Sequence, residues 1–532
     1  MNLFIFFAAI IIIICISLGK ISFKYGIPTL LAFIVLGMLF GSDGILKIGF
    51  DNYSFAEQIC SIALIFIMFY GGFGTNMKKA KPVALKSVLL SSLGVILTAF
   101  FTGLFCYFVL KIPILESFLI GSVIGSTDAA SVFAILRSKK LNLKYNTASL
   151  LEVESGSNDP FAYMLTVIVL SLMKGEFSAG QMIYMIFAQI IFGALFGVIT
   201  AVAALFVLKR AKFTASGSDS LFVFSIALVS YSGAALIGGN VYLSTYITGI
   251  ILGNKPIKNK KTMVGFFDGL NGLMQIAIFF LLGLLSFPSQ LPKVALPALA
   301  IALFLTFIAR PLAVFAILTP FKCPFNQQLL VSLAGLRGAA SIVFAIMAQV
   351  SAAHIGNDIF HIVFFIVLFS ISLQGTLIPI AAKKLGMTDD SSDVMKTFSD
   401  YSEEVPVEFI KLQINLAHPW ANHKIKDIKL LPQTLIVLLV RGSEHIVPKG
   451  NTVILPNDIA VISAPSIEGE YLGSLTEIRI DHDSEWLGKA LSEIKFDSDM
   501  LVVMIKRKNS IIIPEGKTKL RENDVMIINH SQ

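Results

Sequence analysis

A cluster of polar residues interrupts an apolar stretch of the chain between residues 147 and 172. It contains Glu152, Glu154, Asn158 and Asp159, which place three carboxylates and one amide within eight residues. A charged side chain at the centre of a bilayer costs roughly 2.5–3.5 kcal/mol on insertion scales, so three facing lipid would cost on the order of 8–10 kcal/mol. We therefore expect the cluster to face a protein interior or a water-filled cavity, where such residues mark a functional site.

The spacing of the cluster suits an ion site lined by oxygen atoms. On a helix, Glu154 and Asn158 are four residues apart and share a face, and Ser155 lies between Glu154 and Asp159 in angle. Carboxylate, amide and hydroxyl oxygens are hard ligands, which suit alkali cations or protons rather than soft metals. Because desolvation disfavours a charged carboxylate, one buried aspartate could hold either a proton or a cation, but not both. That competition is the simplest mechanism for exchanging the two.

The composition places the cluster in a membrane protein. The chain has 532 residues, of which 55% are hydrophobic and only 14% are charged, whereas soluble domains average about 25% charged residues. The net charge of +8 fits cytoplasmic loops of a lipid-embedded protein better than nucleic-acid binding. The four cysteines lie in apolar segments without paired spacing, so neither disulfides nor a zinc site is expected.

The fold class predicted from the apolar segments is a polytopic α-helical membrane protein of about thirteen transmembrane helices. The predicted spans are 3–19, 27–43, 54–73, 84–110, 114–136, 147–173, 181–208, 218–237, 240–254, 264–287, 294–318, 327–351 and 359–382. Alternate loops are rich in lysine and arginine, as at 78–81, 137–144 and 255–261. The positive-inside rule then puts the N-terminus outside and the C-terminal tail in the cytoplasm.

Two distant spans are interrupted near their middles. The fifth contains Gly125-Ser126-Thr127-Asp128, and the twelfth contains Gly335-Leu336-Arg337-Gly338. Polar and glycine-rich interruptions of this kind indicate broken helices that cross at an ion site at the membrane midplane. The spacing also suits inverted repeats, in which span five corresponds to span twelve.

Several polar residues near the cluster have two possible roles. Glu154 is either a second ligand or a brace whose charge is paired with Arg337 or Arg310. Asp128 either binds the ion or caps the positive N-terminal end of a half-helix. Glu152 lies nearer the cytoplasmic end of its span, which favours a gating or solvated role.

One further polar residue lies in an apolar span. Gln275 more often makes a hydrogen bond between helices at such a position than it binds an ion.

At these residues the chain resembles the cation:proton antiporter superfamily, in its NhaP-type branch. Four motifs carry the resemblance, which covers residues 1–384: Phe69-Tyr70-Gly71-Gly72, Ser126-Thr127-Asp128, the cluster 152–159, and Ala334-Gly335-Leu336-Arg337-Gly338-Ala339. The motifs are specific when they occur together and in this order. The likeness is strongest to the potassium/proton, cell-volume-regulation subgroup.

The resemblance implies how such a site would work. It implies Asp159 as ligand of a monovalent cation and as proton carrier, supported by Asn158, Thr127, Ser155 and Glu154. The Asn-Asp pair resembles the electroneutral branch, which exchanges one cation per proton. The family also implies a homodimer in a bacterial inner membrane, with a core domain that moves like an elevator against a dimerisation domain.

The tail has a different composition and contains an internal repeat. Residues 385–405 are acidic and polar and are predicted to form a linker, followed by two small α+β domains at 406–470 and 471–532. The repeat has an offset of 66 residues, without gaps, and matches Trp420 to Trp486, Leu435 to Leu501, Pro448 to Pro514 and Asp458 to Asp524. Each copy is expected to contain a strand (407–414, 474–480), a short helix (422–430, 488–495), a β-rich core (433–441, 499–507) and a last apolar strand (458–464, 524–529).

Each copy of the repeat resembles an RCK-C (TrkA-C) domain, a ligand-sensing module of potassium channels and transporters. No glycine-rich dinucleotide fingerprint precedes the copies, so NAD and ATP binding are not expected. The resemblance implies a small anionic regulator, with cyclic di-AMP as the leading candidate. Lys449, Arg441 and His445 could contact its phosphates, although basic surface residues are more often simply solvated.

The sequence therefore predicts a potassium/proton antiporter with a regulatory tail. A sodium/proton antiporter of the same fold is the first alternative, because oxygen ligands alone do not decide between the two ions. A ligand-gated potassium channel is the second, but its carbonyl filter sequence Thr-Val-Gly-Tyr-Gly is absent from the chain. An enzyme is not expected, because the carboxylates lack a neighbouring nucleophile or metal pattern.

Overall fold

The computed structural model divides the chain into two units, Met1–Glu403 and Glu404–Gln532. The residues described are 2–530, except 26–27, 140, 176–178, 211–216, 258, 352, 354 and 390–406, and except 417, 432–433, 443, 466–473, 483, 497–499, 508–509 and 513 in the tail. Most of the predicted acidic linker, from residue 390 onward, thus lies outside the described residues.

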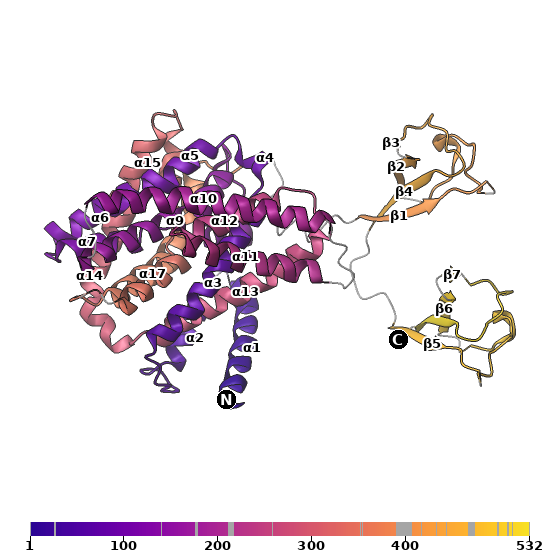
Figure 1. Ribbon diagram of the computed structural model, residues 1–532, viewed down its shortest axis with the longest axis horizontal. Helices are drawn as coiled ribbons and strands as arrows, with labels where there is room; N and C mark the ends of the chain where they lie inside the picture. The colour runs from indigo at the N-terminus through magenta and orange to yellow at the C-terminus, as the bar shows by residue number, and fades with distance from the viewer. Residues whose placement is uncertain are drawn as a thin grey trace. The chain divides into compact units, whose positions relative to one another are not determined.

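The first unit is helical, and every one of the thirteen predicted spans coincides with one or more helices (Figure 1). In the first half they are α1 (Asn2–Tyr25), α2 (Thr29–Phe40), α3 (Tyr53–Gly74), α4 (Met77–Ala80), α5 (Ala84–Leu89), η1 (Leu90–Gly94), α6 (Val95–Phe108), α7 (Ile114–Val123), α8 (Ala129–Ser138), α9 (Thr147–Lys174) and α10 (Ala179–Arg210). In the second half they are α11 (Ser218–Leu236), α12 (Val241–Gly253), α13 (Lys260–Leu285), η2 (Pro288–Gln290), α14 (Leu291–Phe304), η3 (Leu305–Ala309), α15 (Arg310–Leu318), α16 (Phe325–Leu333), α17 (Ala339–Val350), α18 (Ile359–Phe369), η4 (Ser370–Gln374) and α19 (Gly375–Lys384). Among the described residues, seven continuous helices are long and apolar enough to cross a membrane, and shorter apolar helices accompany them.

The two predicted helix breaks are confirmed, and they touch each other. Residues 124–128 separate α7 from α8, and residues 334–338 separate α16 from α17. The backbone N–H of Asp128 donates to the carbonyl of Leu336 over 2.7 Å, which joins one break to the other. Gly338 makes this approach possible, because a Cβ there would lie 2.5 Å from the Asp128 side chain.

Irregular turns also occupy corresponding places in the two halves. The span before the first break contains the π-helical turn η1, and the span before the second contains the π-helical turn η3. Such π turns are rare and often lie at functional sites. Their matched positions are what an inverted repeat predicts, and η3 ends directly before Arg310.

Small residues let the helices around the site pack closely. Gly37 of α2 faces Gly283 of α13 so tightly that a Cβ on Gly37 would lie 2.9 Å from the Gly283 Cα. Close backbone approach through small residues replaces the hydrophobic driving force that is lost in lipid. The contact fixes α13, which contributes one wall of the cavity described below.

The tail contains two sheets of identical topology (Figure 1). The first has the strand order β1-β4-β2-β3 and the second the order β5-β8-β6-β7, with antiparallel neighbours throughout. The strands are β1 (Val407–Gln413), β2 (Leu435–Arg441), β3 (Glu444–Ile446), β4 (Ile459–Pro465), β5 (Ser474–Arg479), β6 (Met500–Arg507), β7 (Ser510–Ile512) and β8 (Val525–His530). The predicted short helices were wrong in extent. Each is a single 3₁₀ turn, η6 (Ile425–Asp427) or η7 (Leu491–Glu493), with backbone N–H groups that donate to carbonyls of a neighbouring loop.

Each sheet has its own core and the same ion pair, in which the aspartate is buried and the arginine is partly exposed. Arg441 donates two hydrogen bonds to Asp458, over 2.9 and 2.8 Å, and Arg507 makes the equivalent bonds to Asp524 over 2.8 and 2.7 Å. The hydrogen bonds from Arg441 lower the pKa of Asp458, outweighing the opposite effect of burial. The pairing gives Arg441 a structural role that needs no ligand, and the predicted contact with a phosphate stays a prediction.

The ion pair of the first repeat is expected to stabilise that repeat. Replacing Arg441 by Met leaves the buried Asp458 carboxylate with unsatisfied hydrogen bonds, which costs about 1–3 kcal/mol. Urea unfolding followed by tryptophan fluorescence measures this directly, because the only tryptophans, Trp420 and Trp486, lie one in each repeat. Trp486→Phe isolates the signal of the first repeat.

The pH dependence and a control sharpen the test. Because the folded-state pKa of Asp458 is lowered, the pair contributes stability above the ordinary aspartate pKa and loses it as pH falls through the lowered value. The difference between the parent and Arg441→Met should therefore shrink in acid. Arg479→Met in the second repeat, read through Trp486 in a Trp420→Phe background, removes an exposed pair with Asp481 at 3.7 Å and should change the stability of that repeat by less than about 1 kcal/mol. Equal effects of the two substitutions would contradict the assignment.

Candidate ion-binding site

The centre of the site is Asp159, in the middle of α9. Its side chain is buried, and Pro160 follows it inside the helix. Proline supplies no N–H to the carbonyl four residues earlier, so the helix is weakened just where the carboxylate lies. Asn240, the N-cap residue of α12, donates to the Pro160 carbonyl over 2.7 Å, which joins this part of α9 to the start of α12 in this conformation.

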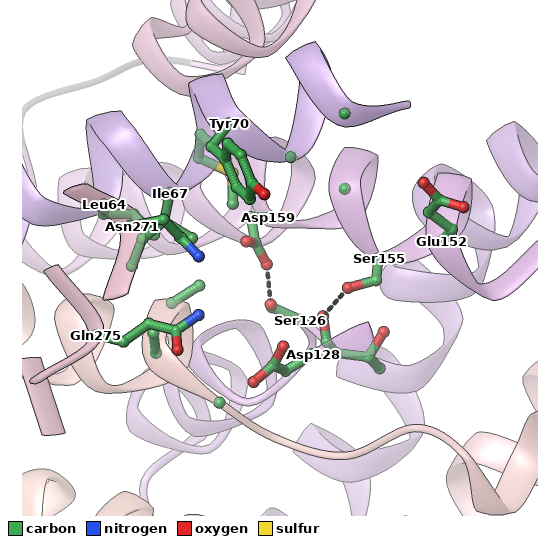
Figure 2. A pocket seen from close by; sticks show the side chains of 18 of the residues that line it. Leu64, Ile67, Tyr70, Ser126, Asp128, Glu152, Ser155, Asp159, Asn271 and Gln275 are labelled. Atoms are coloured by element: carbon green, nitrogen blue, oxygen red, sulfur yellow. Dashed lines mark hydrogen bonds between the residues drawn. The ribbon is translucent and has the colours of Figure 1, made fainter. Parts of the chain in front are cut away.

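The first helix break supplies the hydroxyl that contacts Asp159. Ser126 is buried, and its Oγ donates to Asp159 Oδ1 (Figure 2). We did not single out Ser126 from the sequence, although it lies in the Ser126-Thr127-Asp128 motif. Its position in an unwound segment was the available signal, because a side chain there is free of helical geometry and can turn toward α9.

Two neighbours of Asp159 fasten the same break to α9. Asn158 Nδ2 donates to Thr127 Oγ1 over 2.6 Å, and Ser155 Oγ donates to the Thr127 carbonyl over 2.8 Å. The Oδ1 atom of Asn158 is buried and has no hydrogen-bond partner among the described residues. Asn158, Thr127 and Ser155 are thus brought together beside Asp159; Thr127 and Ser155 line the cavity described below, and Asn158 is not among its lining residues.

A cavity of about 180 Å³ opens onto Asp159, Ser126 and Ser155 (Figure 2). Its wall is built from α3, α9, α13, α17 and the first break, and its polar lining includes Tyr70, Ser126, Thr127, Asp128, Glu152, Ser155, Asp159, Asn271 and Gln275. Since a water molecule occupies about 30 Å³ in the liquid, the cavity can hold a cation together with several waters. Its lining oxygens are hard ligands of the kind that suit alkali cations.

Of the two roles considered for Glu154, second ligand or brace paired with an arginine, its position fits the brace. It forms an ion pair with Arg310, and both side chains are buried, with 1% and 2% of their surface exposed. Glu154 does not line the cavity, unlike Ser155 on the next position of α9. The π turn η3 ends directly before Arg310, so the irregular helix delivers the compensating charge.

The second arginine serves a different purpose. Arg337 lies in the second break, and its Nη1 donates to the carbonyl of Ser126 over 2.7 Å. Its backbone N–H donates to Ser370 Oγ over 3.0 Å. Arg337 therefore ties the two breaks together and satisfies an unwound carbonyl, and it is Arg310 that pairs with Glu154.

Asp128 caps the second half of its broken helix. Its Oδ2 accepts a hydrogen bond from Ser131 Oγ over 2.6 Å, and its Oδ1 accepts one from the Ser131 N–H over 3.3 Å. Ser131 is the third residue of α8, which is the usual partner of a capping carboxylate. Asp128 also faces the cavity (Figure 2), so its negative charge bears on any cation bound there.

The wall of the cavity formed by α13 contains Asn271, a residue that the sequence analysis did not single out. Gln275, which we expected to bond to a neighbouring helix, lines the cavity, and Asn271 lies one turn earlier on α13. Two amides four residues apart share a helix face. That spacing within an apolar span was the signal that could have identified the pair.

Comparison with known proteins places these motifs in one family. Residues 7–384 match the family model described as sodium/hydrogen exchanger, transmembrane, and residues 412–467 and 475–529 each match the TrkA-C domain. The K(+)/H(+) antiporter NhaP2 of Shewanella sp. strain MR-4 is 32% identical over 483 residues, covering 89% of this chain and 83% of that relative. The K(+)/H(+) antiporter NhaP of Alkalimonas amylolytica is 33% identical over 467 residues, covering 87% and 81%.

A solved structure shares the fold of the helical unit. It is the sodium proton antiporter MjNhaP1 from Methanocaldococcus jannaschii at pH 8, with a TM-score of 0.63 and 24% identity. The match covers 72% of this chain and 99% of that chain.

The buried ion pair is expected to support the site without binding the ion. Removing one partner from a buried pair leaves an uncompensated charge and costs about 3–5 kcal/mol. Glu154→Gln and Arg310→Met should each lower the thermal stability of the detergent-solubilised protein strongly, and the double variant should be less destabilised than their sum. Glu152→Gln, on the same helix but at the cavity mouth, is the matched control. Additive effects of the two substitutions would refute the pairing.

Proposed function

Since the chain belongs to the sodium/hydrogen exchanger family, it is a membrane cation/proton antiporter, and we propose that it exchanges one potassium ion for one proton. The observation that carries the proposal is the placement of Asp159. Its buried carboxylate opens onto a polar cavity, and no basic side chain contacts it among the described residues. A carboxylate in that position can exchange a bound proton for a bound cation.

The exchange follows from competition for one carboxylate. Protonated Asp159 is neutral and needs no cation, whereas ionised Asp159 needs one to offset the loss of hydration. Ser126 Oγ, which contacts Asp159 and lines the cavity, would contribute to the coordination, and Asn158 would support the site through its hydrogen bond to Thr127. Because Asn158 is uncharged, the site has a single exchanging charge, and either form crosses the membrane without net charge.

The choice of potassium and the movement are further parts of the proposal. The relatives that cover most of this chain are named as potassium/proton antiporters, which favours potassium over sodium. We propose a homodimer in a bacterial inner membrane, with the N-terminus outside and the tail in the cytoplasm. The helices around the crossed breaks would move as an elevator against α3, α12 and α13.

The regulatory role of the tail is also proposed, and the start of the linker suggests a route. We place the transport domain at 1–384, the linker at 385–405, and the two sensing domains at 406–470 and 471–532, with an anionic regulator such as cyclic di-AMP. Residues 387–389 pair with the loop between α8 and α9, through Lys144 N–H to the Met387 carbonyl (2.9 Å) and Asp389 N–H to the Asn142 carbonyl (3.0 Å). Tension on the linker would thus act on the loop that joins the capped half-helix to the helix of Asp159.

Substituting the central carboxylate tests the proposed exchange. Asp159→Asn should reduce potassium-driven proton movement in everted vesicles by at least about 100-fold, because the amide cannot alternate between proton and cation. Size-exclusion chromatography should show an unchanged folded protein. Substantial remaining exchange would remove Asp159 from its assigned role.

The same assay tests the ion and the stoichiometry. Fluorescence dequenching should respond to potassium at lower concentration than to sodium, and the rate should not depend on an imposed membrane potential. A preference for sodium would replace potassium in the proposal. A potassium current without coupled proton movement would indicate a channel instead.

The linker route predicts a specific uncoupling. If the tail regulates transport, deleting residues 400–532 changes the apparent KM for the cation or its pH profile. Asp389→Pro in the full chain should shift the same parameter in the same direction, because proline removes the N–H that bonds to Asn142 while Thr388 keeps the extended conformation that a following proline favours. Asp389→Ala, which keeps the N–H, is the control. A truncated protein identical to the full chain would refute tail regulation, and a normal Asp389→Pro would refute this route.

A further inference from the structure

A second cavity is lined by α3, α9 and α17, three of the helices that also line the first cavity. It lies near the C-terminal end of α9. Its volume is about 340 Å³, and its lining includes Glu57 of α3, Ser171 and Lys174 of α9, and Met347 and Val350 of α17. The first cavity is lined by Gly71 and Gly74 of α3, Asp159 of α9, and Ala339 and Ala340 of α17. Each helix therefore lines the first cavity with one part of its length and the second cavity with residues nearer its other end.

The faces that line the two cavities are continuous along α9. Ser171 is twelve residues beyond Asp159, which corresponds to about 18 Å along the helix. Lys174 and Leu170, which both line the second cavity, lie within about 60° of Asp159 around the helix axis, at 3.6 residues per turn. One face of α9 therefore leads from Asp159 to the second cavity.

A layer of aromatic rings separates the two cavities. Tyr163, one turn beyond Asp159, packs against Tyr242 of α12 with ring centroids 5.0 Å apart and against Phe344 of α17 at 5.9 Å. Tyr242 and Phe344 are 6.0 Å apart and buried, so the three rings form a closed triangle. On α17, Phe344 lies between Ala340 of the first cavity and Met347 of the second.

The second cavity has a carboxylate that the exchange mechanism does not use. Glu57 is half-buried, and Ser61 Oγ donates to its Oε1 over 2.9 Å. Ser61 lies on α3 between Glu57 and Leu64, which lines the first cavity. Lys174 is the basic group of the same cavity. A cation there would be attracted by the Glu57 carboxylate and repelled by the Lys174 ammonium group.

We propose that the second cavity is the external entrance of the ion pathway, in which Glu57 binds the arriving monovalent cation. Tyr163, Tyr242 and Phe344 close the entrance in this structure, while the first cavity is open to Asp159. The inference rests on the proposed exchange across the membrane. It adds an entry site on the external side of the membrane, opposite the cytoplasmic side on which we place Glu152 of the first cavity.

Charge substitutions with measurements from each side test the entry site. Potassium is titrated outside right-side-out vesicles, and separately on the cytoplasmic face in everted vesicles. Glu57→Gln should raise the external apparent KM by about three- to tenfold, because a carboxylate at a cavity mouth raises the local cation concentration. Lys174→Gln should lower the external KM, and both should leave the cytoplasmic KM unchanged. Glu152→Gln is the mirror control and should alter the cytoplasmic KM alone.

Cysteine labelling tests the cavity and the aromatic layer without relying on transport. The four native cysteines are buried, so the background is low. A membrane-impermeant thiol reagent outside intact cells should label Ser171→Cys rapidly and Ala340→Cys slowly, and adding Tyr163→Ala should accelerate labelling of Ala340→Cys. Slow labelling of Ser171→Cys would refute the external cavity, and an unchanged rate at Ala340→Cys would refute the layer.

The outcomes separate this inference from the proposed function. If the wild-type protein exchanges no cation for protons, the proposed function fails, and the labelling still decides whether the cavity opens outward. If exchange is normal but Glu57→Gln and Lys174→Gln leave the external KM unchanged, the entry site fails alone. Equal shifts of the KM on both faces would also refute it.

Discussion

The crossing of two interrupted helices is the contact on which the rest of the site depends. Unwound backbone inside a membrane must find hydrogen-bond partners within the protein, because lipid offers none. Here each break supplies partners for the other. Asp128 N–H bonds to the Leu336 carbonyl, and Arg337 bonds to the Ser126 carbonyl. The third partner is α9, through Ser155 and Asn158, so the ion-site helix is locked to the crossing rather than merely adjacent to it.

This locking sorts the charged residues by function. Glu154 and Arg310 neutralise each other in a buried pair, and Arg337 donates a hydrogen bond to the backbone carbonyl of Ser126. Asp128 is partly occupied by its cap on α8. Asp159 is then the buried carboxylate whose contact, the Ser126 hydroxyl, is neutral. A neutral partner does not fix the protonation state of a carboxylate as an arginine would, and this is the condition for alternating between proton and cation.

Features with a strong local cause could be predicted from the sequence. Apolar length defined the thirteen spans, polar and glycine-rich interruptions defined the breaks, and the 66-residue repeat gave two sheets of the same strand order. Choices between equivalent partners could not be predicted. Arg310 and Arg337 are both basic residues at membrane depth, and only the π turn before Arg310 and the crossing at Arg337 decide which one meets Glu154. Ser126 and Asn271 were missed because their roles depend on helices far apart in sequence.

The same geometry explains how one structure can serve two sides of a membrane. Helices α3, α9 and α17 each line both cavities, and α9 and α17 contribute rings to the aromatic layer between them. The aromatic rings of the layer can separate more readily than backbone joined by hydrogen bonds, since they are held by side-chain contacts of about 0.5–1.5 kcal/mol each. The crossed breaks, in contrast, are joined by backbone hydrogen bonds. Movement should therefore take place at the rings and between helices, with the crossing carried intact, and Asp159 would keep its coordination while its access changes.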